Sequence, residues 1–323
     1  MRRFRCRSDF RLSGGTGSVL ASIKSARCIV VFALFFSSLP VLAEEEKSDW
    51  FKPILSLAKS GEYQVEETYV GGASVSRGAH TVSDFDEHDV GFRFILTPRV
   101  KLGILRLGVE WEHFSFGFSG KAPLPNTFQS ANLVLGLDTQ ISDSILMRFE
   151  VQPGFYGTNN ADANQMNVPF IIGGSYIYNP NVQIIAGISF DIERDYPVIP
   201  AAGVRWKLSR QWVLNAVLPT PRLEYEATKA VTLYAGANIK QTNFRMEPDF
   251  GTSHGIKRLN NAVLSYSEVR GGIGGNWKLA SFATLTVEAG YQPYRNFDFY
   301  RSNVRFHETD SAPYVMISLH GAF

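Results

Sequence analysis

The sequence predicts an all-β fold: a transmembrane antiparallel up-and-down β-barrel of about fourteen strands, with about twelve as the alternative. Three observations lead to this prediction. The chain begins with an export signal and has no later apolar stretch long enough for a transmembrane helix. Apolar and polar residues alternate with a period of two in segments of about ten residues. The chain ends on an aromatic residue, Phe323, within one such segment.

Residues 1–43 have the pattern of a secretory signal peptide. Basic residues from Arg2 to Arg27 precede the apolar run 28–36, and the small-x-small site 41–43 follows. The apolar run is shorter than the roughly 20 residues that a membrane-spanning helix needs. We therefore expect cleavage after Ala43, a periplasmic lead-in at 44–60 and a transmembrane barrel over 61–323, located in the cell outer membrane.

Removal of the leader changes the bulk composition. The precursor contains 32 basic and 30 acidic residues, of which the leader holds 7 and 1, so the mature chain has a net charge of −4. This balance gives no support for nucleic-acid binding. Both cysteines, Cys6 and Cys28, lie in the leader, which leaves no disulfide or thiolate metal site. No histidine spacing suits a metal, and we expect no metal and no cofactor.

Alternating faces define the expected strands. Between 145 and 152, for example, Ile145, Met147 and Phe149 alternate with Arg148 and Glu150. By this rule we place strands at 61–73, 86–97, 100–116, 130–140, 144–156, 167–178, 181–191, 200–208, 211–218, 221–228, 231–244, 263–278, 282–294 and 312–323.

The connections between these segments alternate between short and long, with one exception at Pro219-Thr220-Pro221. The parity works for all fourteen strands if that segment is a tight outer turn. If the segment were a bulge within one strand, the strand count would be odd and this assignment would break. Outer-membrane barrels have short periplasmic turns and longer outer loops, so the asymmetry favours a membrane barrel over a soluble sandwich. Aromatic residues at strand ends, such as Trp206, Trp277 and Trp111, fit girdles at the two membrane interfaces.

The inward positions carry charges of both signs. Because a charge facing lipid at the bilayer midplane costs about 2–4 kcal/mol, these side chains are expected to face the interior. The predicted lumen-lining residues are Arg93, Arg106, Glu110, Glu112, Arg148, Glu150, Arg205, Lys207, Arg222, Glu224, Glu226, Lys240, Glu268, Arg270 and Glu288. They are compatible with a pore whose charges select solutes, and equally with a lumen closed by ion pairs.

Motifs for catalysis are nearly absent, and we expect no enzyme. The candidate catalytic residues are His113 and Ser115, because an i, i+2 pair shares one strand face and a histidine there can activate a serine. This pair is similar to the His-x-Ser of outer-membrane phospholipases and lipid A deacylases. The similarity covers three residues, Phe116 and Gly117 follow in place of the phospholipase Asn-Gly, and no orienting acid can be named from the sequence.

The final strand, Val315 to Phe323, resembles that of Gram-negative outer-membrane β-barrel proteins, and the resemblance extends over the mature chain. It implies that this strand closes the barrel and that Phe323 is the assembly signal read by the barrel assembly machinery. The segment 218–225 resembles a barrel family described as a domain of unknown function. That resemblance implies a fold and a location but no activity.

We therefore expect an outer-membrane barrel that acts as a passive pore or solute channel with a mixed-charge lumen. The first alternative is a structural or surface-binding barrel with a closed lumen, in which the aromatic and basic loop 295–311 either binds a ligand or packs on the barrel mouth. The second is an outer-membrane lipid hydrolase that uses the His-x-Ser pair. The expected partners are outer-membrane lipid and the assembly machinery, and the oligomeric state is left open.

Overall fold

The computed structural model describes residues 60–323 except 79, 120–121 and 159–161. The predicted signal peptide and residues 44–59 of the lead-in lie outside the described residues. Across the described part of the chain, no helix combines the length and the apolar character that crossing a membrane would require.

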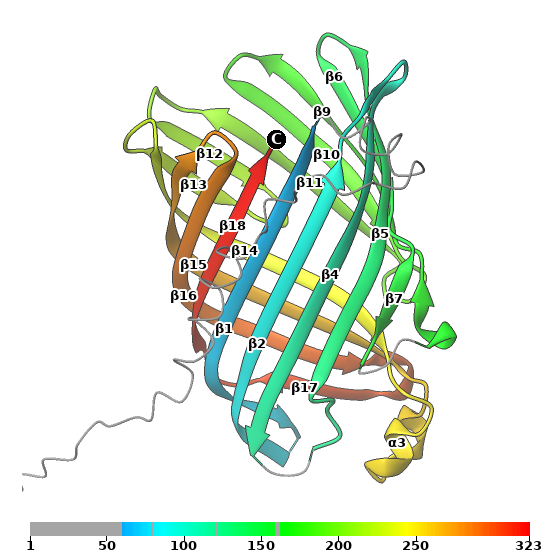
Figure 1. Ribbon diagram of the computed structural model, residues 1–323. Helices are drawn as coiled ribbons and strands as arrows, with labels where there is room; N and C mark the ends of the chain where they lie inside the picture. The colour runs from blue at the N-terminus through cyan, green and yellow to red at the C-terminus, as the bar shows by residue number, and fades with distance from the viewer. Residues whose placement is uncertain (1–59, 79, 120–121, 159–161) are drawn as a thin grey trace, which may run out of the picture. The chain divides into compact units, whose positions relative to one another are not determined.

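The described strands form one antiparallel sheet that closes into a barrel (Figure 1). Their bounds are β1 Gly61–Arg77, β2 His80–Leu96, β3 Arg99–Val100, β4 Gly103–Ser119, β5 Thr127–Ser142, β6 Ile145–Val151, β7 Gly154–Gly157, β8 Met166–Asn167, β9 Phe170–Asn179, β10 Val182–Phe190, β11 Val198–Lys207, β12 Trp212–Val217, β13 Arg222–Glu226, β14 Val231–Arg245, β15 Val263–Ala280, β16 Ala283–Phe299, β17 Val304–Glu308 and β18 Ala312–Ala322. Four short helices lie between strands: η1 Ala163–Gln165, α3 Phe250–Ser253, η2 Lys257–Leu259 and η3 Tyr300–Ser302.

The barrel has 14 strands, as predicted. The pairs β6/β7 and β8/β9 each count as one barrel strand, interrupted where Pro153 and Pro169 cannot donate to the ladder. The carbonyl oxygens of Pro153 and Pro169 accept hydrogen bonds from the backbone amides of Leu133 and Gln152, both at 2.9 Å, so the wall stays continuous. The strands β3 and β17 are not counted as barrel strands, because each is short: β3 pairs only with β4, and β17 pairs with the ends of β1 and β16.

The last strand closes the barrel. β18 pairs with β16 on one side and with β1 on the other, and β1 continues into β2. Gly61 and Phe323 exchange both backbone hydrogen bonds at 2.9 Å, and the Phe323 ring lies 6.2 Å from that of Phe94. The closing role that the resemblance to outer-membrane barrels implied for the terminal strand is confirmed.

The segment Pro219-Thr220-Pro221 is the tight turn that the strand count requires. It joins β12 to β13, and the Thr220 amide donates to the Val217 carbonyl at 3.1 Å. The carbonyl oxygens of Pro219 and Pro221 accept from Ile239 and Ala237 of β14 at 3.0 and 2.9 Å. These bonds fasten the shortest hairpin of the barrel to its long neighbour.

The structure differs from the predicted boundaries at the end with long connections. Most of the predicted loop 74–85 belongs to β1 and β2, residues 117–119 and 127–129 of the predicted loop 117–129 belong to β4 and β5, and 295–311 contains the end of β16 together with β17. Figure 1 shows this loop end, with α3 and β17, opposite the short turns near β6 and β9. One face there is buried, as at Val82, Phe85 and Phe128, and the other is exposed, as at Thr81, Ser83 and Ser119, so the strands continue beyond the ends that the sequence periodicity predicted.

Candidate functional site

Aromatic side chains fill the interior at the loop end. This aromatic plug consists of Phe85, Phe114, Phe116, Phe128, Phe244, Tyr266 and Phe297, all buried. Phe128 on β5 stacks on Phe244 on β14 at 4.5 Å, and Tyr266 on β15 lies 5.3 Å from Phe114 on β4. These strands are not neighbours in the sheet, so the contacts cross the interior. The plug occludes that half of the barrel.

A buried ionic cluster adjoins the plug. It comprises Glu87, Asp89, Glu112, Lys240, Glu268, Arg270 and Arg295. Arg270 contacts Glu268 at 2.8 Å and Glu87 at 3.1 Å, and Arg295 contacts Glu87 at 2.9 Å.

The plug and the ionic cluster share contacts. Lys240 lies 3.0 Å from Asp89 and 4.5 Å above the Phe114 ring. The Tyr266 hydroxyl donates to Glu87 at 2.7 Å. Since buried charges are retained only when paired and hydrogen-bonded, these groups hold β2, β14, β15 and β16 together across the interior.

A second set of charged side chains occupies the half nearer the short turns. Arg106 pairs with Glu150 at 3.3 Å and with Glu62, and Arg148 makes two bonds to Asp138 at 2.6 and 2.7 Å. Glu288 accepts from the hydroxyls of Tyr234 and Tyr314, both at 2.5 Å. These pairs lie along the wall and leave space between opposite walls.

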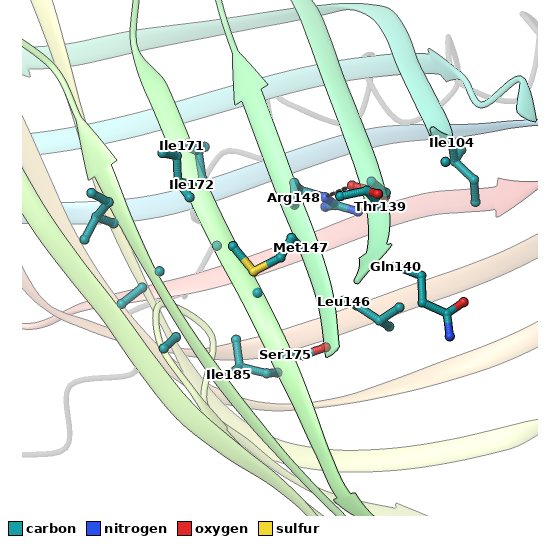
Figure 2. A pocket seen from close by; sticks show the side chains of 18 of the residues that line it. Ile104, Thr139, Gln140, Leu146, Met147, Arg148, Ile171, Ile172, Ser175 and Ile185 are labelled. Carbon is teal, nitrogen blue, oxygen red and sulfur yellow. Dashed lines mark hydrogen bonds and ion pairs between the residues drawn. The ribbon is translucent and has the colours of Figure 1, made fainter. Parts of the chain in front are cut away.

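That space is a cavity of about 990 Å³ (Figure 2). Its lining is largely apolar and includes Ile104, Leu146, Ile171, Ile185 and Pro219, together with Gly173 and Gly187. The main polar groups are the Arg148–Asp138 pair, Gln140, Gln183 and Ser175. Backbone of β9 and β10 forms part of the wall because glycines there carry no side chain. The cavity can hold a small, mainly apolar molecule.

The predicted lumen-lining residues fall into two groups. Arg93, Arg106, Glu110, Glu112, Arg148, Glu150, Arg222, Lys240, Glu268, Arg270 and Glu288 form ion pairs. Arg205, Lys207 and Glu226 are exposed and Glu224 is half-buried; among the described residues, no ion pair involves these four. That the charges line a conducting path stays a prediction.

The loop 295–311 packs on the barrel, as one of the two alternatives expected. Arg295, Phe297, Phe299 and Phe306 are buried, and Phe297 belongs to the plug. The Tyr300 hydroxyl donates to the Glu193 carbonyl at 2.8 Å. This loop therefore seals the interior.

Sequence reasoning missed several interior residues. On β2 the positions of Glu87, Asp89 and Arg93 differ by even numbers, so their side chains lie on the same face. Applying the inward parity of Arg93 to the whole strand would have identified both acids as inward. Parity could not identify Arg295. Between the pairs Val269–Tyr294 and Gly271–Tyr291, β16 contains one extra residue, and this bulge reverses which side chains of the following part of β16 face inward.

The candidate pair His113 and Ser115 lies on the opposite, outward face. The ladder pairs His113 with Val90 and Ser115 with His88, and these alternate with the interior residues Glu112 and Phe114. The Nε2 atom of His113 is 3.1 Å from Oγ of Ser115, so the two side chains are within hydrogen-bond reach.

Comparison with protein families gives one match, which covers residues 97–321 and carries the description "domain of unknown function" (DUF6268). Among curated proteins, none has significant similarity to this chain.

Several solved structures are similar to this chain. A COG4313 outer membrane channel from Pseudomonas putida F1 has 11% identity and a TM-score of 0.47, and the alignment covers 87% of this chain and 100% of that one. The Pseudomonas putida toluene transporter TodX has 9% identity and a TM-score of 0.42, with 86% and 94% covered. A Pseudomonas aeruginosa FadL homologue has 10% identity and a TM-score of 0.31, with 82% and 89% covered.

Proposed function

The chain belongs to the DUF6268 family, and from this premise we propose that it is an outer-membrane channel for small, largely apolar solutes. The observation that carries the proposal is the division of the interior. A cavity of about 990 Å³ occupies the half near the short turns, while the aromatic plug and the ionic cluster fill the other half.

The size and lining of the cavity support the solute class. Ligand pockets typically measure about 300–1,000 Å³ and are lined mainly by apolar side chains with a few polar groups. Of the charged side chains that line the cavity, Arg148 and Asp138 make a bidentate pair with each other, and Arg99 is exposed. A charged solute would lose water on entering this mainly apolar cavity, and burying a charge without a partner is costly.

An outer-membrane location is part of the proposal. The outward face carries exposed apolar residues such as Leu133, Ile273 and Val315, which suits a lipid environment. The predicted export signal and the closure of the barrel by β18 are consistent with that destination.

The plug would act as the gate of the channel. It consists of side chains rather than a folded domain, and one of its rings, Phe297, comes from the end of β16, which pairs with both β15 and β17. Rotation of the plug side chains inside the barrel would open the path without breaking the backbone ladder of the wall. A passive, permanently open pore is less well supported, because both the plug and the cluster cross the interior.

Solute flux into liposomes tests this function. The double variant Phe128→Ala, Phe297→Ala removes two buried plug rings, whereas Phe92→Ala removes a ring from the outward face. We expect osmotic swelling of liposomes carrying the double variant to be faster with leucine than with aspartate, and little swelling with wild type or Phe92→Ala. A folded double variant that admits neither solute would favour the closed structural barrel, and equal rates for both would contradict the apolar solute class.

A further inference from the structure

Four polar side chains gather on the outward face near the loop end. They are Glu67 on β1, His88 on β2, and His113 and Ser115 on β4. In the ladder Glu67 lies beside Ile317 and Val90, and Ser115 lies directly opposite His88. Ile317 is 41% exposed on the same outward face. The cluster therefore belongs to the surface that faces lipid, separate from the interior cavity.

The four residues make two short contacts. Besides the 3.1 Å contact between His113 and Ser115, Nε2 of His88 lies 2.8 Å from Oε1 of Glu67. The His88 and Glu67 side chains are 37% and 27% exposed, and His113 and Ser115 are half-buried. All four can be reached from the surroundings of the barrel.

The position of the cluster points to a bilayer lipid. Trp111 stacks on His113 with 5.9 Å between ring centres, and Tyr69 lies beside His88 in the ladder. Tyrosine and tryptophan concentrate where hydrocarbon meets headgroups. The acyl esters of membrane lipids lie at that same boundary, so an ester carbonyl can approach Ser115 from the side.

From this geometry we infer that the outward face is an acyl-ester hydrolase site for membrane lipids, with Ser115 as nucleophile and His113 as general base. In the first step Oγ of Ser115 attacks the ester carbonyl while Nε2 of His113 takes the hydroxyl proton. The bond to the lipid alkoxide breaks, and His113 returns the proton to that leaving oxygen. A water molecule, deprotonated by His113, then attacks the acyl-serine; the bond to Oγ breaks, His113 gives that proton to Oγ of Ser115, and the fatty acid is released.

The His88–Glu67 pair lies beside the nucleophile. Directly opposite residues in an antiparallel pair have Cβ atoms about 4.5–5.5 Å apart, so the His88 ring lies within reach of a group bound at Ser115. The contact with Glu67 fixes the orientation of the His88 ring. His88 is therefore a positioning residue that borders the ester group bound at Ser115.

The test combines hydrolysis with covalent labelling. Refolded full-length protein in detergent micelles would be incubated with phospholipid and, separately, with lipopolysaccharide, and released fatty acid would be measured. A fluorophosphonate probe would report a reactive serine by mass spectrometry. The variants are Ser115→Ala, Glu67→Gln and, as a matched control at the opposite end of the barrel, Ser144→Ala.

We expect the wild type and Ser144→Ala to release fatty acid and to carry the label on Ser115. Ser115→Ala should lose the label and about 10²–10⁴-fold of the rate, and Glu67→Gln should keep the label site while slowing hydrolysis. Hydrolysis that persists in folded Ser115→Ala would overturn the assignment, and so would a folded wild type that neither cleaves lipid nor reacts at Ser115. The liposome flux of the channel is independent of either result.

Discussion

At the scale of single residues, Arg295 connects the two parts of the occluded half. It is fully buried, lies 4.7 Å over the Phe85 ring, and contacts Glu87 at 2.9 Å and Glu308 at 3.5 Å. Its guanidinium also donates to the Phe85 carbonyl at 3.1 Å. One side chain thus ties the plug to the ionic cluster and to β17.

Replacing Arg295 by Met should strongly destabilise the barrel, because it leaves Glu87 and Glu308 buried without this partner. Breaking a buried ion pair typically costs about 3–5 kcal/mol. Urea titration of the protein in lipid vesicles would measure the loss. Arg305→Met is the matched control, since the Arg305 side chain is 62% exposed beside Asp298 and should cost at most about 1 kcal/mol. Equal midpoints for wild type and Arg295→Met would contradict this role.

The limits of sequence reasoning are also visible at this scale. Parity identified Arg106, Lys240 and Arg270 as inward, and the structure pairs each of them with an acid. It could not find Glu67 and His88 as partners near Ser115, because the contact depends on the register of β1, β2 and β4. Glu67 faces outward between Val65 and Tyr69, and an acid between these apolar positions was the available signal.

At the scale of elements, the alternation predicted the fourteen barrel strands, and most of their ends lie within three residues of the observed bounds. It failed where strands continue beyond the predicted loops, as in β1 to Arg77 and β16 to Phe299. Phe297 and Phe299 are buried there for reasons of tertiary packing, which a local period of two cannot reveal. The arm β17 was missed for the same reason.

The arm β17 should respond to pH through Glu308. Burial raises the pKa of this carboxyl to about 7, with nearby Glu87, Glu268 and Asp310 adding to the rise and Arg295 opposing it. Because the pKa in the folded protein is raised, the neutral form stabilises the arm at low pH, and this contribution is lost as pH rises through about 7.

Hydrogen-exchange protection factors for Val304–Glu308, corrected for intrinsic rates, should therefore fall as the pH rises from 4.5 to about 7. Glu308→Gln should remove most of this change. The β18 strand, paired on both sides, serves as the internal reference. Protection of the arm that stays the same at both pH values in the wild type would contradict the assignment.

At the scale of the whole molecule, one barrel combines an occluded half, an open cavity and an outward polar cluster. The closed sheet and the mixed charges follow from the sequence, whereas the sequence is equally compatible with an open lumen and with one closed by ion pairs. In the structure, contacts across the interior such as Phe128–Phe244 and Lys240–Asp89 fill only one half of the barrel. That outcome depends on which distant strands face each other, and no local pattern records it.

Single-channel recording in planar bilayers tests the central claim most directly. The wild type and the Phe92→Ala control should give no stable conductance steps, whereas the Phe128→Ala, Phe297→Ala variant should give discrete, lasting ones. Charge reversal at Arg148 in that open variant should then shift its ion selectivity. Stable steps of the same size in wild type and plug variant would contradict the account, because the aromatic plug would then not close the path.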